Sequence, residues 1–132
     1  MSNVDLKANR PLSPHLQIYR PMLTMMMSIV HRITGAALYF GTFFLAIWLV
    51  AAASGPKAFA VVDGIYSSWF GQLVMFGYTW ALLHHMLGGF RHFIWDTGRG
   101  FGPEERELLA KATLIGSIAL TVLVWVVALI VR

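Results

Sequence analysis

Three long stretches of this sequence contain no charged side chain. Neither Asp, Glu, Lys nor Arg occurs in Ile33–Ala53, Gly64–Phe90 or Ala112–Val131. Each stretch exceeds the roughly 18–20 residues that a helix needs to cross about 30 Å of hydrocarbon. Because backbone amides in lipid must pair within their own segment, each stretch is expected to be an α-helix. The sequence therefore predicts an all-α membrane protein with three transmembrane helices.

The residues around these stretches complete a single membrane-anchor domain, 1–132. The tail 1–21 is polar and lacks the apolar core of a signal peptide, so the first span is expected to remain as an anchor. The spans are expected at about 22–53, 64–95 and 110–131. A Gly-Pro turn signal lies in the predicted loop Ser54–Asp63, and Glu104–Lys111 is expected to form a short interfacial helix.

The composition agrees with a lipid environment and limits the possible chemistry. Only 12% of the residues are charged, whereas ordinary globular domains carry about 25%. The net charge of +4 sits at the ends of apolar runs, a pattern that argues against nucleic-acid binding. The chain has no cysteine, which excludes disulfides, cysteine-ligated zinc and iron–sulfur clusters within it. A bound metal would need histidine or oxygen ligands, and the histidines are His15, His31, His84, His85 and His92.

Lysine and arginine are distributed unequally between the two sides of the predicted bundle. Eight lie on the side of the N-terminus: Lys7, Arg10, Arg20, Arg32, Arg91, Arg99, Arg106 and Lys111. Only Lys57 and Arg132 lie on the opposite side. By the positive-inside rule, the N-terminus is expected in the cytoplasm or matrix and the C-terminus on the outer side.

A first polar cluster opens the first span. Ser28, His31, Arg32 and Gly35 recur at spacings of three and four, so they are expected to share one helix face. A quinone head group needs donors at its carbonyl oxygens, stabilisation of negative charge and a proton route. Ser28 and Arg32 offer the first two, and His31 offers a proton relay. The alternative is that Arg32 only reaches phospholipid head groups as a topology anchor.

A second polar cluster lies at the inner end of the second span. His85 and His92 are seven residues apart, hence on one face and about 10 Å apart along the axis. Gly88 and Gly89 between them open a slot that suits a flat macrocycle, with Arg91 and His92 near its carboxylates. Haem held by an axial histidine is the expected cofactor. The alternative is a glycine-lined contact between helices.

The two adjacent histidines cannot both face this slot. His84 and His85 point about 100° apart, and only His85 shares its face with Gly88, Gly89 and His92. His85 is therefore the expected iron ligand. His92 is too far along the same helix to bind the same iron, so a sixth ligand has to come from another helix or another chain.

Three motifs in this order resemble the cytochrome b subunit of succinate dehydrogenase, the haem b-containing membrane anchor of respiratory complex II. They are Arg-Pro-Leu-Ser-Pro-His-Leu-Gln-Ile-Tyr at 10–19, Ser-Ile-Val-His-Arg-Ile-Thr-Gly at 28–35 and His-Met-Leu-Gly-Gly-Phe-Arg-His-Phe-Ile-Trp-Asp at 85–96. The resemblance runs from about residue 10 to the C-terminus. It implies that the chain is half of a heterodimeric anchor bundle and has no catalytic activity on its own.

The resemblance also implies roles for individual residues. His85 matches the axial ligand of haem b, whose other ligand is a histidine of the second anchor subunit. His92 and Arg32 match residues near the haem, and Ser28 with Arg32 matches the ubiquinone site. Asp96 matches an acidic residue proposed for proton delivery. The segment at Arg10-Pro11 would dock on the iron–sulfur subunit, and the flavin and iron–sulfur clusters would belong to partner subunits.

Three other readings remain beside this one. A quinol:fumarate reductase anchor would run the reaction in reverse, and the sequence does not show its direction. A haem-free structural anchor would leave the two polar clusters without a role. A transporter is disfavoured because three spans without repeat symmetry lack the usual architecture. The expected location is the bacterial inner membrane, or the mitochondrial inner membrane in a eukaryote.

Overall fold

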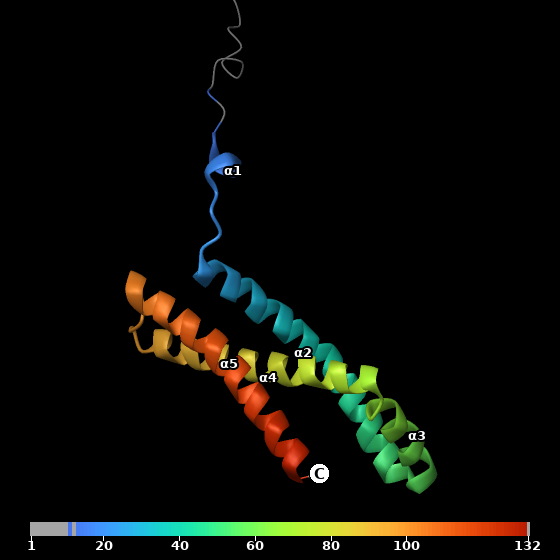
Figure 1. The fold of residues 1–132 in the computed structure, drawn as a ribbon. Helices are drawn as coiled ribbons and strands as arrows, with labels where there is room; N and C mark the ends of the chain where they lie inside the picture. The colour runs from blue at the N-terminus through green and yellow to red at the C-terminus, as the bar shows by residue number, and fades with distance from the viewer. Residues whose placement is uncertain (1–10, 12, 132) are drawn as a thin grey trace, which may run out of the picture.

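The computed structural model describes residues 11 and 13–131, and all regular structure in this part is helical (Figure 1). The helices are α1 (His15–Ile18), α2 (Leu23–Ser54), α3 (Pro56–Tyr66), α4 (Trp69–Asp96) and α5 (Pro103–Val131). The prediction of an all-α protein is confirmed. Of the predicted docking segment Arg10-Pro11, Arg10 lies outside the described residues, as does Arg132 at the end of the chain.

Helix α2 is followed at once by a further helix. Gly55 has a φ of 107°, a left-handed conformation that favours glycine, and it ends α2 after Ser54. Pro56 then begins α3, where its missing N–H would have had no helical partner. The predicted loop Ser54–Asp63 is therefore mostly helical. The Gly-Pro signal marks the change of direction between two helices.

A short link turns the chain from α3 into α4. The Ser68 hydroxyl caps α4 by accepting from the Gly71 backbone N–H at 3.1 Å. The Tyr66 hydroxyl donates to the Phe44 carbonyl at 2.7 Å and ties the end of α3 to α2. Because of this cap, α4 begins at Trp69, five residues after the start that apolarity alone predicted at Gly64.

The link from α4 to α5 depends on glycine. Gly98 and Gly100 have φ angles of 77° and 80°. A side chain on Gly100 would also crowd Leu109, since its Cβ would lie 2.9 Å from the leucine Cδ1. Glu105 accepts from the Gly102 N–H at 3.0 Å at the start of α5. The predicted short helix Glu104–Lys111 forms the first turns of α5, without a break before the apolar part.

The bundle is apolar outside and polar inside. Helix α4 packs against both α2 and α5, which also touch each other (Figure 1). The largest side chains that are almost fully enclosed are His84, Thr34, Thr121 and Ser117. Large apolar side chains such as Phe43 and Ile115 are each 66% exposed. Small and hydroxyl-bearing contacts beneath an apolar surface are typical of helices that associate in lipid.

Two helices, α2 and α5, are long and apolar enough to cross a membrane. Helix α4 has 28 residues, which corresponds to about 42 Å at 1.5 Å per residue. Its interior polar residues lower its hydropathy, and its place between α2 and α5 explains why it can be less apolar than they are.

Candidate functional site

Three imidazole rings gather where the N-terminal part of α2 meets the C-terminal half of α4. The rings of His31 and His85 stack with centroids 4.0 Å apart and planes only 3° from parallel. The ring of His92, seven residues further along α4, lies 5.3 Å from that of His31. The structure therefore brings together histidines from both polar clusters. Sequence spacing could relate only His85 and His92, which lie on one helix, and could not place His31 beside them.

Two glycines provide the space for the stacked rings. A Cβ added at Gly35 of α2 would lie 2.9 Å from Cε1 of His85. A Cβ added at Gly88 of α4 would collide with Nδ1 of His31. Any larger residue at either position would displace a ring. Gly89 meets nothing within 4 Å, so only the first glycine of the pair contributes to this contact.

The hydrogen bonds of His85 assign its tautomer. Its Nδ1 lies 3.1 Å from the backbone oxygen of His31, which can only accept. The Thr34 hydroxyl donates to the same carbonyl at 3.0 Å and lies 3.4 Å from Nδ1. Nδ1 therefore carries the proton, and Nε2 keeps a free lone pair. A histidine that ligates a metal through one nitrogen commonly donates its other N–H to a backbone carbonyl in this way.

The preceding histidine faces the opposite helix. His84 is fully enclosed, with 0% of its side chain exposed, and its Nδ1 lies 3.2 Å from the Ser117 hydroxyl of α5. Its Nε2 is buried and has no hydrogen-bond partner among the described residues. The adjacent histidines are thus divided between the two helices that flank α4, and only His85 belongs to the three-ring cluster.

Arg91 lies deeper in the bundle than an interfacial anchor would. Its side chain is only 4% exposed, and its guanidinium carbon is 5.2 Å from the centre of the Trp95 ring. The Arg91 Nε has no hydrogen-bond partner within the described part of the chain. His92 is exposed and packs edge-on against Trp95, with ring centroids 5.1 Å apart. Arg91 and His92 therefore both contact Trp95, but the Arg91 side chain is buried whereas that of His92 is exposed.

The structure divides the first polar cluster, which was expected to share one face. His31 and Gly35 lie on the side of α2 that packs against α4, whereas Ser28 and Arg32 are exposed. The physical reason is that Thr34, 2% exposed, is the centre of the packed face. Arg32 lies about 160° around the helix from Thr34, whereas Ser28 lies nearly in line with Gly35 but about two turns nearer the start of α2. Ser28 and Arg32, four residues apart, remain neighbours on the open surface.

Asp96 ends α4 and is exposed. A carboxylate near a helix C-terminus is unfavourable to the helix dipole, so the residue does not contribute to helix stability there. The only ion pair in the described part of the chain joins Lys111 and Glu107 at 2.8 Å, on the surface of α5. Asp96 is therefore not held in place by a cation of the described residues.

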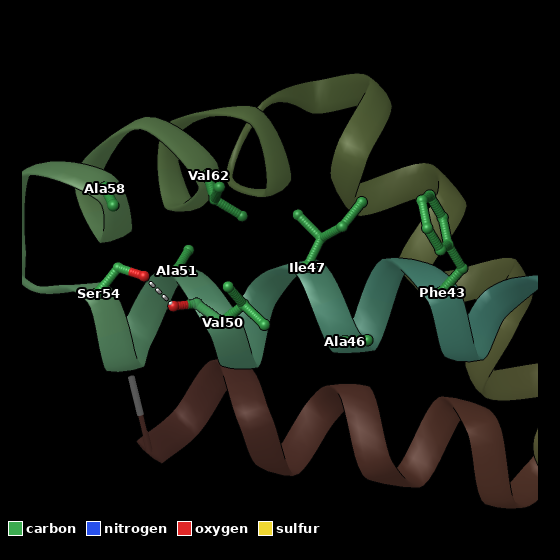
Figure 2. A pocket seen from close by; sticks show the side chains of 8 residues that line it. All are labelled: Phe43, Ala46, Ile47, Val50, Ala51, Ser54, Ala58 and Val62. Carbon is green, nitrogen blue, oxygen red and sulfur yellow. Dashed lines mark hydrogen bonds between the residues drawn. The ribbon is translucent and has the colours of Figure 1, made fainter.

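Two surface hollows lie apart from the histidine cluster. One, of about 420 Å³, lies between α2 and α3 and is shown in Figure 2. Its lining is Phe43, Ala46, Ile47, Val50, Ala51, Ser54, Ala58 and Val62. The Ser54 hydroxyl is bonded to the Val50 carbonyl at 2.7 Å, so this hollow offers little polar chemistry. The other, of about 520 Å³, is lined by Phe90, Phe93, Ile94, Thr97 and Arg99.

Among residues 11 and 13–131, no group of three or more His, Cys, Asp or Glu is arranged to hold a metal ion. The histidine cluster stacks its rings and does not converge their nitrogens on one point.

Comparison with known proteins gives the family. The family described as "Succinate dehydrogenase/Fumarate reductase transmembrane subunit" matches residues 7–124. The chain belongs to this family. A relative from Paracoccus denitrificans, named succinate dehydrogenase cytochrome b556 subunit, is 44% identical over 127 residues, covering 96% of this chain and 97% of the relative.

More distant relatives carry similar names. The cytochrome b556 subunit of Rickettsia conorii is 35% identical over 122 residues, covering 92% of this chain and 95% of its own length. The mitochondrial cytochrome b560 subunit of Sus scrofa is 40% identical over 103 residues, covering 74% of this chain and 59% of the relative. The resemblance to the cytochrome b membrane subunit of succinate dehydrogenase is confirmed.

The sequence predicted no role for Thr34 or Ser117, and it did not predict that Arg91 would be buried. Thr34 supports the carbonyl that holds His85, Ser117 binds His84, and Arg91 is buried. Buried hydroxyl residues at 113, 117 and 121 recur every four residues on α5, and this spacing was a usable signal for a packed polar face. No sequence signal reveals which residue of α4 faces it.

Proposed function

We propose that this chain holds haem b and forms part of a ubiquinone-reduction site, as one half of the membrane anchor of a succinate:quinone oxidoreductase. The observation that carries the proposal is the hydrogen bond from His85 Nδ1 to the His31 carbonyl at 3.1 Å. That bond leaves Nε2 unprotonated, as an axial ligand requires. The relatives named cytochrome b556 subunits support haem b as the cofactor.

The residues around His85 fit a haem. The His31 Nδ1 is buried without a hydrogen-bond partner among the described residues, so a polar atom near the stacked rings still lacks a partner. His85 would bind the iron, and His31, His92 and Arg32 would neutralise or hydrogen-bond the propionate carboxylates. When bound, haem b supplies a one-electron store. Within this chain, the His31 carbonyl and Thr34 orient the His85 ring. The absence of a side chain at Gly35 and Gly88 leaves room for the stacked imidazole rings.

A second ligand for the haem iron would come from the second membrane-anchor subunit. The flavin and iron–sulfur clusters would reside in the flavoprotein and iron–sulfur subunits, since this chain has no cysteine. The relatives are named as subunits of succinate dehydrogenase, which supports assembly into such a complex.

Ser28 and Arg32 would form this chain's part of the quinone site. Their exposure beside the packed face suits a site completed by residues of the partner subunits. The Ser28 hydroxyl would donate to a quinone carbonyl, and the Arg32 guanidinium would stabilise the negative charge that develops during reduction. Asp96, exposed at the end of α4, would deliver protons from the inner aqueous side.

The proposed topology has α2, α4 and α5 crossing the membrane. The N-terminus and the α4–α5 link would face the cytoplasm or matrix. The C-terminus would face the outer side of the bacterial inner membrane, or of the mitochondrial inner membrane. The eight-to-two distribution of Lys and Arg supports this orientation.

A topology reporter fused after Arg132 tests this arrangement. A reporter that works only outside the cytoplasm is expected to be active, and one that works only in the cytoplasm is expected to be silent. Fusions at Gly98, in the α4–α5 link, provide the matched control and should give the opposite pattern. A C-terminal fusion active only in the cytoplasm would contradict the three-span topology.

The proposed function is tested by the visible spectrum and subunit pattern of the complex solubilised intact. Reduction with dithionite is expected to give the narrow bands of a six-coordinate b-type haem in a preparation that contains the flavoprotein, iron–sulfur and two anchor subunits. A complete complex without haem would establish the haem-free structural anchor instead.

A further inference from the structure

His84 on α4 forms a hydrogen bond to α5, and α4 is also the helix that carries the proposed haem ligand His85. The Nδ1 of His84 lies 3.2 Å from Ser117 Oγ, and the Ser117 hydroxyl donates to the Leu114 carbonyl at 2.9 Å. The serine oxygen is therefore the acceptor, and the His84 Nδ1–H is the donor. Because His84 is 0% exposed within this chain alone, its bond to Ser117 is shielded from lipid and from any partner subunit.

The contact between α4 and α5 combines small residues, a few apolar side chains and two polar bonds. Near His84 the buried residues include the small Ala81 and Gly88 on α4 and Ala110 on α5. Leu87 lies beside Gly116, and Phe76, nearer the start of α4, packs edge-on against Trp125 with ring centroids 5.4 Å apart. Small residues allow helices to approach closely, but they interlock weakly, so polar bonds set the register of such contacts. Besides the His84–Ser117 bond, the Trp125 indole N–H donates to the Thr79 hydroxyl at 3.2 Å, nearer the start of α4.

Consecutive imidazoles thus hold α4 from two sides. His85 donates to the carbonyl of His31 on α2, and His84 donates to Ser117 on α5. A rotation of about 10° moves an atom about 6 Å from the helix axis by roughly 1 Å. A functional site tolerates displacements of roughly 0.5 Å, so such a rotation would move His85 Nε2 too far for its proposed role as a ligand.

We propose that His84 is a positioning residue for the haem ligand: its bond to Ser117 fixes the rotation of α4 that aims His85 at the iron. The inference rests on the proposed function, since it needs a haem at His85. His84 itself would not bind the haem, because its ring faces α5 while that of His85 lies against α2. A metal ligand supported in this way loses metal more readily when the support is removed.

The test measures the rate at which the intact purified complex loses haem to an excess of a haem-binding acceptor protein. His84→Leu and Ser117→Ala are each expected to release haem roughly tenfold faster than the wild type, with a broadened haem signal in electron paramagnetic resonance. The double variant should lose haem no faster than the more affected single variant, because both remove one bond. His84→Asn should stay near the wild-type rate, since its amide places an N–H close to the position of Nδ1.

Thr113→Val is the matched control. Thr113 is buried one turn before Ser117, but its hydroxyl bonds to the Leu109 carbonyl at 2.8 Å, within α5. The variant removes a buried hydroxyl at almost constant volume and should keep the wild-type rate. Should His84→Leu block assembly, Ser117→Ala still decides the question, because it removes only one oxygen.

The outcomes separate the two proposals. A haem-free wild-type complex would overturn the proposed function and this inference with it. Haem present in the wild type, with His84→Leu and Ser117→Ala as slow as Thr113→Val, would overturn the role of His84 alone. Haem loss in His84→Asn as fast as in His84→Leu would also overturn it, since the donor to Ser117 would then be irrelevant.

Discussion

Replacing His85 with leucine is expected to abolish the b-type haem spectrum of the assembled complex, whereas replacing His84 with leucine is expected to leave a haem that is bound less firmly. His85 has its Nδ1 committed to the His31 carbonyl at 3.1 Å, and its Nε2 is free to bind iron. Leucine has no ligand atom, and no other imidazole of the cluster occupies the same position. The measurement is the haem content per complex, from the reduced spectrum and quantified subunits.

The two adjacent positions control for one another. Both histidines become the same apolar residue in the same helix, so a general loss of stability would affect both spectra. Complete loss of haem in His84→Leu with retention in His85→Leu would show that α5, and not α2, faces the cofactor. Equal retention in both variants would move the ligand to another residue.

Replacing Arg32 with leucine is expected to lower succinate-dependent quinone reduction roughly tenfold or more. The loss of one charged hydrogen bond at a partly buried carbonyl costs on the order of 1.5–3 kcal/mol, and each 1.36 kcal/mol in the barrier changes a rate about tenfold. Ser28→Ala should give a smaller loss, because a neutral hydrogen bond contributes only about 0.5–1.5 kcal/mol. Both residues are exposed on α2, away from its contact with α4.

The same preparations should oxidise succinate normally with an artificial acceptor that takes electrons from the hydrophilic subunits. That activity requires neither Ser28 nor Arg32 if their role is limited to the quinone site. Subunit and haem contents are measured alongside, since Arg32 is also proposed to lie near a propionate. A parallel fall of both activities in a complete complex would refute the quinone assignment. Unchanged activities would leave Arg32 as a head-group anchor.

The proposed roles of His85 and His84 both depend on the polar interior of the helix bundle. Thr34, His84, Ser117 and Thr121 are at most 2% exposed, and each of the four bonds to a backbone carbonyl or to a side chain of a neighbouring helix. In lipid, apolar side chains gain little by turning inward, so hydrogen bonds and close contacts between small residues direct association. The site histidines are thus part of the same contacts that hold the helices together.

The sequence by itself determined the long helices and the family. Charge-free stretches of sufficient length can satisfy their backbone in lipid only as helices, so α2 and α5 followed from residue types alone. The motif His85–Asp96, with its seven-residue spacing, indicated one helix face and a family that comparison confirmed. Local spacing also established that His84 and His85 diverge, because every α-helix turns about 100° per residue.

Only the tertiary structure decided which faces meet. It placed His31 against His85 and left Ser28 and Arg32 outside, gave His84 to Ser117, and buried Arg91. It also made most of the predicted loop Ser54–Asp63 a helix. Helical periodicity describes the relation of residues within one helix, but the rotation of that helix depends on partners far along the chain. The gap at Gly35 and the hydroxyl of Ser117 are such partners, and they act on α4 only once the three long helices have packed.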